Sequence, residues 1–128
     1  MYEVRIEDHF AAAHFLRDYH GKCESLHGHN YKVFAHLRGS ELNEGGMLFD
    51  FSQFKSIIHA VLTQLDHTNL NDMDVFKQNP SAERIAKYIY DQTLDLLRKC
   101  ESYASNNVKL FCVEVFETDT NRARYLVD

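Results

Sequence analysis

The sequence is short of several features that define common functional classes. It has no Trp, one Pro and five Gly among 128 residues, which leaves little material for a glycine-rich phosphate-binding loop. Three Cys without a C-x-x-C spacing argue against a disulfide framework, and no apolar run reaches the roughly 18 residues of a membrane span. Lys and Arg number 14 against 19 Asp and Glu, which argues against a broad basic surface for nucleic acid.

The remaining composition is that of one globular domain, 1–128, in a reducing compartment. With 45% hydrophobic residues, the chain can bury a core and is not expected to be disordered. Charged residues in the first five positions argue against a secretory signal, so we expect a cytoplasmic location. Cys100 and Cys112 fall in apolar segments and are interpreted as packing residues. Histidine, in contrast, is abundant, with eight residues in the chain.

Hydrophobic spacing predicts an α+β domain with the order β-β-α-α-β-β. The expected strands span 2–14, 27–38, 108–117 and 122–127, and the expected helices span 51–65 and 79–97, the second with Asn79 as its cap and Pro80 in its first position. A four-stranded antiparallel sheet with two helices on one face satisfies this order. Its edge strands would be open, so we expect a homo-oligomer.

Three histidines fall where they could share one metal ion. His27-Gly28-His29 places two imidazoles on one face of a predicted strand, because side chains alternate along a strand. His14 lies on the apolar side of the preceding strand. Three neutral imidazoles leave the fourth position of a zinc ion open, as in a catalytic site, although surface histidines near a strand start explain the same pattern. The other histidines without an assigned role, His9, His20, His36 and His59, are interpreted as surface residues.

Two further segments carry groups that can move protons. Cys23 lies four residues before His27, where its thiol would either close a zinc site as a fourth ligand or act as a base. Asp66 can orient its neighbour His67 for proton transfer near neutral pH. A solvated helix end explains the Asp66-His67 pair equally well.

Two carboxylates interrupt the apolar strand near the C-terminus. Glu114 and Glu117 must be paired or hydrogen-bonded if that strand is buried. Such a carboxylate can accept two N–H bonds from the amino-pyrimidinone edge of a pterin or a guanine. An ion pair with Arg122 or Arg124 on the next strand is the simpler alternative.

Five segments follow one another along the chain: Phe10-Ala11-Ala12-Ala13-His14, Cys23-x3-His27-Gly28-His29-Asn30-Tyr31, Leu65-Asp66-His67-x2-Leu70-Asn71-Asp72, Asn79-Pro80-Ser81-Ala82-Glu83 and Glu117-Thr118. Together they resemble the 6-pyruvoyl-tetrahydropterin synthase family over nearly the whole chain, and more closely its bacterial branch, the 6-carboxy-5,6,7,8-tetrahydropterin synthases of queuosine biosynthesis. The resemblance implies the tunnelling fold, in which three subunits join their sheets into a barrel and two trimers stack as a hexamer.

The resemblance also implies a role for individual residues. These roles are zinc binding by His14, His27 and His29, catalysis by Cys23, Asp66 and His67, and substrate binding by Glu117, Thr118, Ser81, Glu83 and Lys22. Glu117 is preferred to Glu114 as the pterin anchor because Thr follows it. Lys22 would contact the triphosphate, with a solvated loop lysine as the alternative, and Ser81 stands where the family commonly has Thr. Active sites in the family form between subunits.

The implied reaction is that of a zinc-dependent lyase. It converts the small-molecule substrate 7,8-dihydroneopterin triphosphate to 6-carboxy-5,6,7,8-tetrahydropterin, with release of acetaldehyde and triphosphate. The short stretch from His14 to Cys23 favours this product, because family members that make 6-pyruvoyl-tetrahydropterin typically carry a longer insertion there. Elimination of triphosphate to give the pyruvoyl product is the alternative, and a pterin- or purine-binding protein with structural zinc is a third hypothesis.

Overall fold

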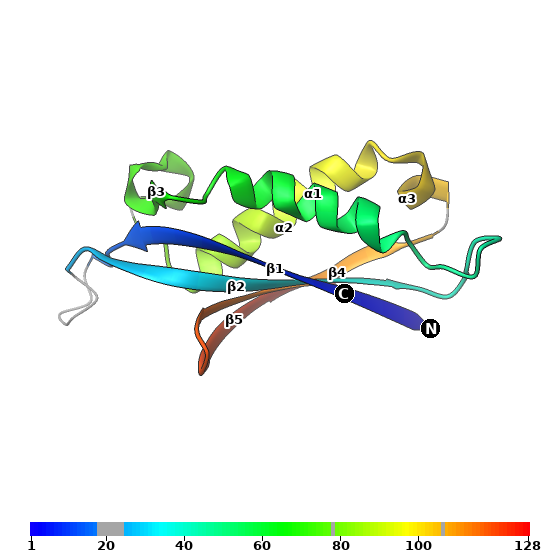
Figure 1. The fold of residues 1–128 in the computed structure, drawn as a ribbon, viewed down its shortest axis with the longest axis horizontal. Coiled ribbons are helices and arrows are strands. Elements are labelled where there is room, and N and C mark those ends of the chain that lie inside the picture. The colour runs from blue at the N-terminus through cyan, green and yellow to red at the C-terminus, as the bar shows by residue number, and fades with distance from the viewer. Residues whose placement is uncertain (18–24, 78, 106) are drawn as a thin grey trace.

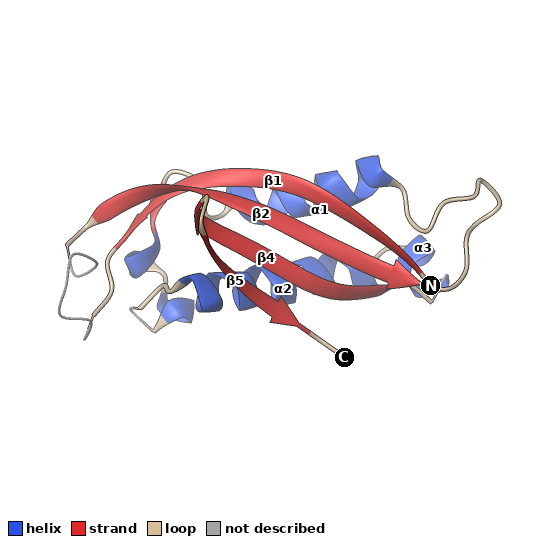
Figure 2. Ribbon diagram, turned by 90° about the horizontal axis from the view of Figure 1, so that it is seen from below, coloured by secondary structure: helices blue, strands red, loops and turns tan. Residues whose placement is uncertain are grey.

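A curved sheet with helices on one face forms the protein in the computed structural model, which describes residues 1–17, 25–77, 79–105 and 107–128 (Figure 1). Its long strands are β1 (Tyr2–His14), β2 (His27–Gly39), β4 (Lys109–Thr118) and β5 (Asn121–Leu126), and its helices are α1 (Phe51–Thr63), α2 (Ala82–Arg98) and the short α3 (Glu101–Ser105). Helix α1 packs on β1, and α2 packs on β4 and β5. Figure 2 shows the opposite face of the sheet, which these helices leave bare.

The α+β class is confirmed, but the expected numbers of strands and helices were too low. The sheet has five strands in the order β3-β1-β2-β4-β5, and it is mixed because β3 (Thr68–Asn69) pairs parallel with Ala12 and Ala13 of β1. Besides α3, two short 3-10 helices follow β3, η2 (Leu70–Asp72) and η3 (Asp74–Phe76). Elements of two to five residues are too short to produce a hydrophobic period, so the sequence did not reveal them.

The caps of the two long helices set the geometry of the loops before them. The Asp50 carboxylate accepts a bond from the backbone N–H of Ser52 at 2.8 Å and caps α1. The cap of α2 is Ser81, whose Oγ accepts from the N–H of Arg84, so the predicted cap at Asn79 was wrong. Pro80 consequently precedes the helix, and its carbonyl oxygen is available to a side chain from the sheet.

The hydrophobic core lies between the helices and the covered face of the sheet. It contains Ile6 and Phe10 of β1, Tyr31, Val33, Ala35 and Leu37 of β2, Val113 and Val115 of β4, and the inward faces of α1 and α2. Alternation along β1 and β2 therefore aims His14, His27 and His29 toward this covered face as well. None of the helices in the described part of the chain is long and apolar enough to cross a membrane.

A polar network lies on the bare face of the sheet. His36 was expected at the surface, but it is 9% exposed, and its Nε2 lies 2.5 Å from Oε1 of Glu114. The other oxygen of Glu114 accepts from Arg122 at 2.7 Å, which confirms the predicted inter-strand ion pair for Glu114. Cys112 beside them is fully buried, as expected for a packing cysteine. Although His36, Cys112 and Glu114 lie close enough to share an ion, both carboxylate oxygens already have partners.

We expect Glu114→Ala to lower the free energy of unfolding by about 1–3 kcal/mol, because buried His36 would lose its hydrogen-bond partner. Arg122 would contribute less to the loss, since its side chain is 44% exposed and can turn to water. Urea unfolding measures the change, with Asp119→Asn as a control that removes an exposed carboxylate nearby. An unchanged midpoint would show that the network does not stabilise the sheet.

Candidate metal centre

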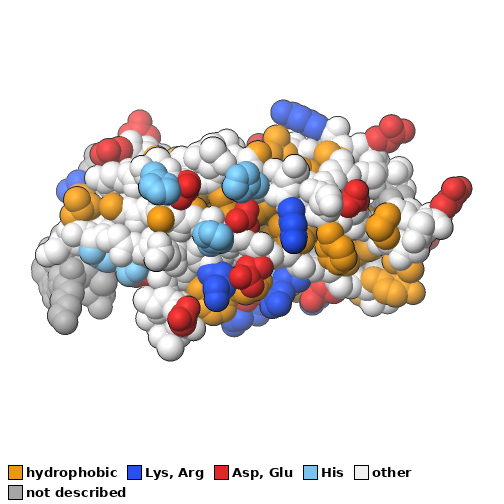
Figure 3. All heavy atoms as spheres, viewed as in Figure 1, with side chains coloured by type: hydrophobic (Ala, Val, Ile, Leu, Met, Phe, Trp, Pro, Cys, Tyr) orange, Lys and Arg blue, Asp and Glu red, His pale blue; other side chains and the backbone are white. Residues whose placement is uncertain are grey.

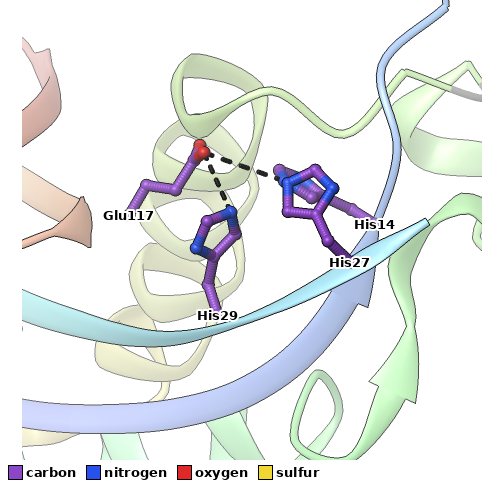
Figure 4. A group of neighbouring side chains, drawn as sticks. All are labelled: His14, His27, His29 and Glu117. Atoms are coloured by element: carbon purple, nitrogen blue, oxygen red, sulfur yellow. Dashed lines mark hydrogen bonds and ion pairs between the residues drawn. The ribbon is translucent and has the colours of Figure 1, made fainter. Parts of the chain in front are cut away.

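Four potential metal ligands converge at one end of the sheet, on its covered side (Figure 4). His14 ends β1 and lies opposite His27 in the β1–β2 pairing, and His29 follows two positions along β2. Glu117 comes from β4, at the register shift between Phe116 and Thr118. One ligand atom from each of His14, His27, His29 and Glu117 lies within 4.8 Å of the others. The sheet thus joins all three predicted zinc ligands and adds a carboxylate.

The backbone fixes which ring nitrogens of two histidines face the centre. Nδ1 of His14 donates to the carbonyl of Pro80 at 3.0 Å, and Nδ1 of His27 donates to the carbonyl of Ser25 at 2.6 Å. Because a carbonyl oxygen only accepts, the neutral form of each ring has its proton on Nδ1 and a lone pair on Nε2. These two Nε2 atoms are 3.1 Å apart. Facing lone pairs repel unless a cation lies between them.

The spacing of these donors fits zinc. Ligands at about 2.0–2.1 Å from a tetrahedral zinc ion lie roughly 3.3 Å from one another. The Nε2 atoms of His14 and His27 come close to that value at 3.1 Å. Nε2 of His29 is buried without a hydrogen-bond partner, which is costly in a protein interior unless something binds the atom. The residues present therefore fit a zinc ion.

Burial keeps His14 and His29 in the neutral form that a metal would require. It lowers the pKa of His14, and the Pro80 hydrogen bond and the Glu117 carboxylate oppose this effect without cancelling it. Burial also lowers the pKa of His29. Both imidazoles are consequently neutral at pH 7, as metal binding requires. The Tyr31 hydroxyl lies 3.1 Å from Nδ1 of His14, and burial raises the pKa of Tyr31, so this group stays protonated.

Glu117 belongs to this centre and not to an arginine pair. Its Oε1 lies 3.1 Å from Nε2 of His29 and 3.8 Å from Nε2 of His14. The arginine partner expected for one of the two strand carboxylates belongs to Glu114 instead. Glu117 also borders a cavity of about 370 Å³, together with Glu83 and Arg122. The carboxylate therefore lies between the donor group and a space large enough for a small ligand.

Asp66 and His67 form a pair at the edge of the sheet, as hypothesised. Nδ1 of His67 lies 2.9 Å from Oδ2 of Asp66. Two bonds fasten the pair to β1: Oδ1 of Asp66 accepts from the N–H of Ala11, and the N–H of His67 donates to the Ala11 carbonyl. The Ala11 bond, followed by the contact with His67, lowers the pKa of Asp66. The pair is held in place although the His67 side chain is 83% exposed.

The structure does not bring His67 into the group of four donors. His67 borders a hollow of about 510 Å³ that Ala13, Gly28 and His29 also line. Ala13 and Gly28 alternate with His14 and His27 and face the other side of the sheet, whereas His29 belongs to the donor group. Figure 3 shows histidine and acidic side chains together on the exposed surface over β1 and α1. Within one chain, His67 therefore lies across a shared hollow from His29 without joining the donor group.

The remaining predicted substrate contacts are placed as follows. Glu83 lies at the cavity beside Glu117, whereas the Ser81 hydroxyl accepts the capping bond of α2. Thr118 is exposed, with its Oγ1 3.3 Å from Oγ1 of Thr120. Lys22 and Cys23, and with them His20, lie outside the described residues.

The sequence did not reveal the groups that orient the histidines. The Pro80 carbonyl reaches His14 across 66 positions, and no local pattern signals such a contact. Ser25 lies two residues before His27, but the bond to its carbonyl depends on the turn that enters β2. Of the groups that contact these histidines, only Tyr31 could be recognised from the sequence, because it continues the alternation of His27 and His29.

The model of the family described as 6-pyruvoyl tetrahydropterin synthase matches residues 3–127. The chain belongs to the 6-pyruvoyl tetrahydropterin synthase family. A relative from Bacillus subtilis (strain 168), named 6-carboxy-5,6,7,8-tetrahydropterin synthase, is 37% identical over 93% of this chain and 80% of its own length. A Synechocystis sp. protein of the same name is 35% identical over 98% of this chain and 93% of its own length. The 6-pyruvoyl tetrahydrobiopterin synthase of Drosophila melanogaster is 36% identical over 82% of this chain and 61% of its own length.

Solved structures of family members share the fold. The Caenorhabditis elegans 6-pyruvoyl tetrahydropterin synthase superposes with a TM-score of 0.80 at 30% identity, covering 100% of this chain and 98% of that one. A Plasmodium vivax 6-pyruvoyltetrahydropterin synthase gives 0.76 at 26% identity, covering 97% and 96%. The tunnelling fold expected from the resemblance is confirmed for the subunit, and the oligomeric barrel stays a prediction.

Proposed function

We propose that this family member is a zinc-dependent lyase that converts 7,8-dihydroneopterin triphosphate and water to 6-carboxy-5,6,7,8-tetrahydropterin, with release of acetaldehyde and triphosphate, in queuosine biosynthesis. The observation that carries the proposal is the convergence of three imidazoles, those of buried His14 and of half-buried His27 and His29. The Nδ1 bonds of His14 and His27 leave an Nε2 lone pair toward the centre. The names of the Bacillus and Synechocystis relatives support the carboxy product.

In this proposal the chain's own groups hold the substrate and move its protons. Zinc bound by His14, His27 and His29 would supply Lewis acidity to the side-chain oxygens beside the pterin ring. Glu117 at the cavity would accept N–H bonds from the amino-pyrimidinone edge and hold the ring in register. His67, oriented by Asp66, would take the hydroxyl proton whose removal drives carbon–carbon cleavage, and Cys23 as a thiolate would move the proton on the side-chain carbon.

A complete site would then need more than one chain. His67 is not among the four donors that converge within one chain, so the pair of Asp66 and His67 is not placed at the zinc centre of its own chain. In the described sheet, β5 forms one edge, and β1 is paired on its outer side only at Ala12 and Ala13. Open edges of this kind favour strand pairing between subunits. We therefore extend the proposal to a homo-oligomer, with a hexamer of two stacked trimers as the expected assembly.

The product of the reaction tests the proposal. We expect zinc-loaded protein incubated with 7,8-dihydroneopterin triphosphate to yield 6-carboxy-5,6,7,8-tetrahydropterin, identified by its mass. A mass corresponding to 6-pyruvoyl-tetrahydropterin would favour the activity named for the Drosophila relative and would overturn the proposed product. Substrate binding without any turnover would favour a pterin-binding protein with structural zinc.

A further inference from the structure

The carboxylate of Glu117 lies where a fourth ligand of a tetrahedral ion would lie. Its Oε1 is 3.1 Å from Nε2 of His29 and 3.8 Å from Nε2 of His14. These distances bracket the edge of roughly 3.3 Å between ligands of a tetrahedral zinc ion. With three neutral imidazoles, one carboxylate would reduce the charge of the centre from +2 to +1, which lowers the cost of burying the ion.

The contact between Glu117 and His29 is not an ordinary hydrogen bond. Nε2 of His29 is buried and has no partner with hydrogen-bond geometry, although the carboxylate oxygen is only 3.1 Å away. No lysine or arginine among the described residues has an ion pair with Glu117, and Arg122 at the same cavity is paired with Glu114. An oxygen and a nitrogen held this close without hydrogen-bond geometry are arranged like two ligands of one cation.

The position of Glu117 on β4 allows its carboxylate to move away from the histidines. It lies at the register shift between Phe116 and Thr118, and such irregularities re-aim side chains next to functional sites. Its side chain is 22% exposed, and it borders the cavity of about 370 Å³. A change of rotamer would carry the carboxylate from the histidines into that cavity.

From this geometry we propose that Glu117 is the fourth metal ligand in the substrate-free chain and gives up that position when a pterin enters. The inference rests on the proposed zinc centre and deepens it. One carboxylate then has two successive partners, first the metal and then the pterin ring. The metal gains an open coordination position only when a pterin is present to draw Glu117 away.

Cobalt(II) tests this proposal, because its visible absorption depends on the identity and number of its ligands. We expect Glu117→Gln to weaken cobalt binding by at least about 10-fold, and to change the absorption spectrum of the loaded protein. Asp119→Asn is the matched control, since it removes the same charge two residues away on an exposed turn. This control should bind cobalt as the wild type does. Circular dichroism of each variant verifies that it is folded.

A pterin tests the exchange itself. With saturating 7,8-dihydroneopterin, the spectra of wild type and Glu117→Gln should coincide, because residue 117 is then not a metal ligand in either protein. Equal cobalt affinity and equal spectra before the pterin is added would overturn the fourth-ligand assignment. Spectra that still differ with the pterin bound would overturn the exchange.

His29→Gln separates failure of this inference from failure of the proposed function. If His29→Gln loses cobalt while Glu117→Gln binds it as the wild type does, the histidine centre stands and Glu117 is not its ligand. If the wild type binds no cobalt or zinc, the proposed metal centre fails, and the role of Glu117 fails with it. Loss of affinity in both variants, with Asp119→Asn unaffected, is the result that we expect.

Discussion

His14→Ala should abolish both zinc binding and turnover. His14 is the most enclosed of the ligands, with no exposed surface, and the Pro80 carbonyl and the Tyr31 hydroxyl hold its ring in place. Its removal deletes a ligand and leaves Nε2 of His27 without the neighbour that it faces at 3.1 Å. We expect zinc affinity to fall by more than about 100-fold, beyond the range for loss of an outer-shell partner. Zinc per chain after dialysis, measured by mass spectrometry, gives the result.

A matched control for this variant is His59→Ala. His59 is exposed on α1, where its Nδ1 lies 3.2 Å from the carboxylate of Asp8, and it has no place in the donor group. We expect this variant to keep full zinc content and full turnover. If His14→Ala retained zinc as His59→Ala does, the metal would not be bound where the three histidines converge.

His67→Gln should lose turnover while it keeps zinc. The structure separates this imidazole from the metal ligands and fastens it to Asp66, so its removal leaves the metal centre intact. Loss of a positioned general acid or base costs about 10²–10⁴-fold in rate, and we expect kcat to fall within that range. Asp66→Asn should show a smaller loss, because His67 keeps its ring but loses its orienting carboxylate. Turnover and zinc content measured on the same sample separate the two effects.

Mixing two inactive variants tests whether the site is shared between chains. His14→Ala supplies an intact pair of Asp66 and His67, and His67→Gln supplies an intact set of zinc ligands. If subunits exchange and each site combines both sets, the mixture should regain part of the wild-type turnover. Continued inactivity in a mixture shown to contain mixed oligomers would contradict a site built from two chains.

The long strands and the convergence of the three histidines could be predicted from the sequence because both follow from alternation. The pairing of β1 with β2 places His14 opposite His27, and a period of two then adds His29 on the same face. The strand β3, at Thr68–Asn69, could not be predicted because two residues carry no period. His36 has a polar pattern on its strand, yet Glu114 of the neighbouring strand covers it. Its burial depends on a contact 78 positions away.

For the two glutamates of β4, the sequence likewise predicted only part of what the structure shows. Either glutamate could have paired with an arginine, and only the register of β4 against β5 decides that Glu114 meets Arg122. The register shift beside Glu117 turns that carboxylate toward His29 instead. A shift of this kind depends on how two strands meet and has no signature within one strand. The sequence therefore singled out Glu117 as a candidate site residue but did not predict its contact with the histidines.

The most direct test of the account is the release of acetaldehyde from 7,8-dihydroneopterin triphosphate by zinc-loaded and zinc-stripped protein. Carbon–carbon cleavage at the histidine centre predicts one acetaldehyde for each tetrahydropterin formed by the loaded protein. It also predicts none from the stripped protein, with recovery when zinc is restored. Turnover without acetaldehyde would contradict the proposed cleavage, and equal release by the stripped protein would contradict a role for zinc.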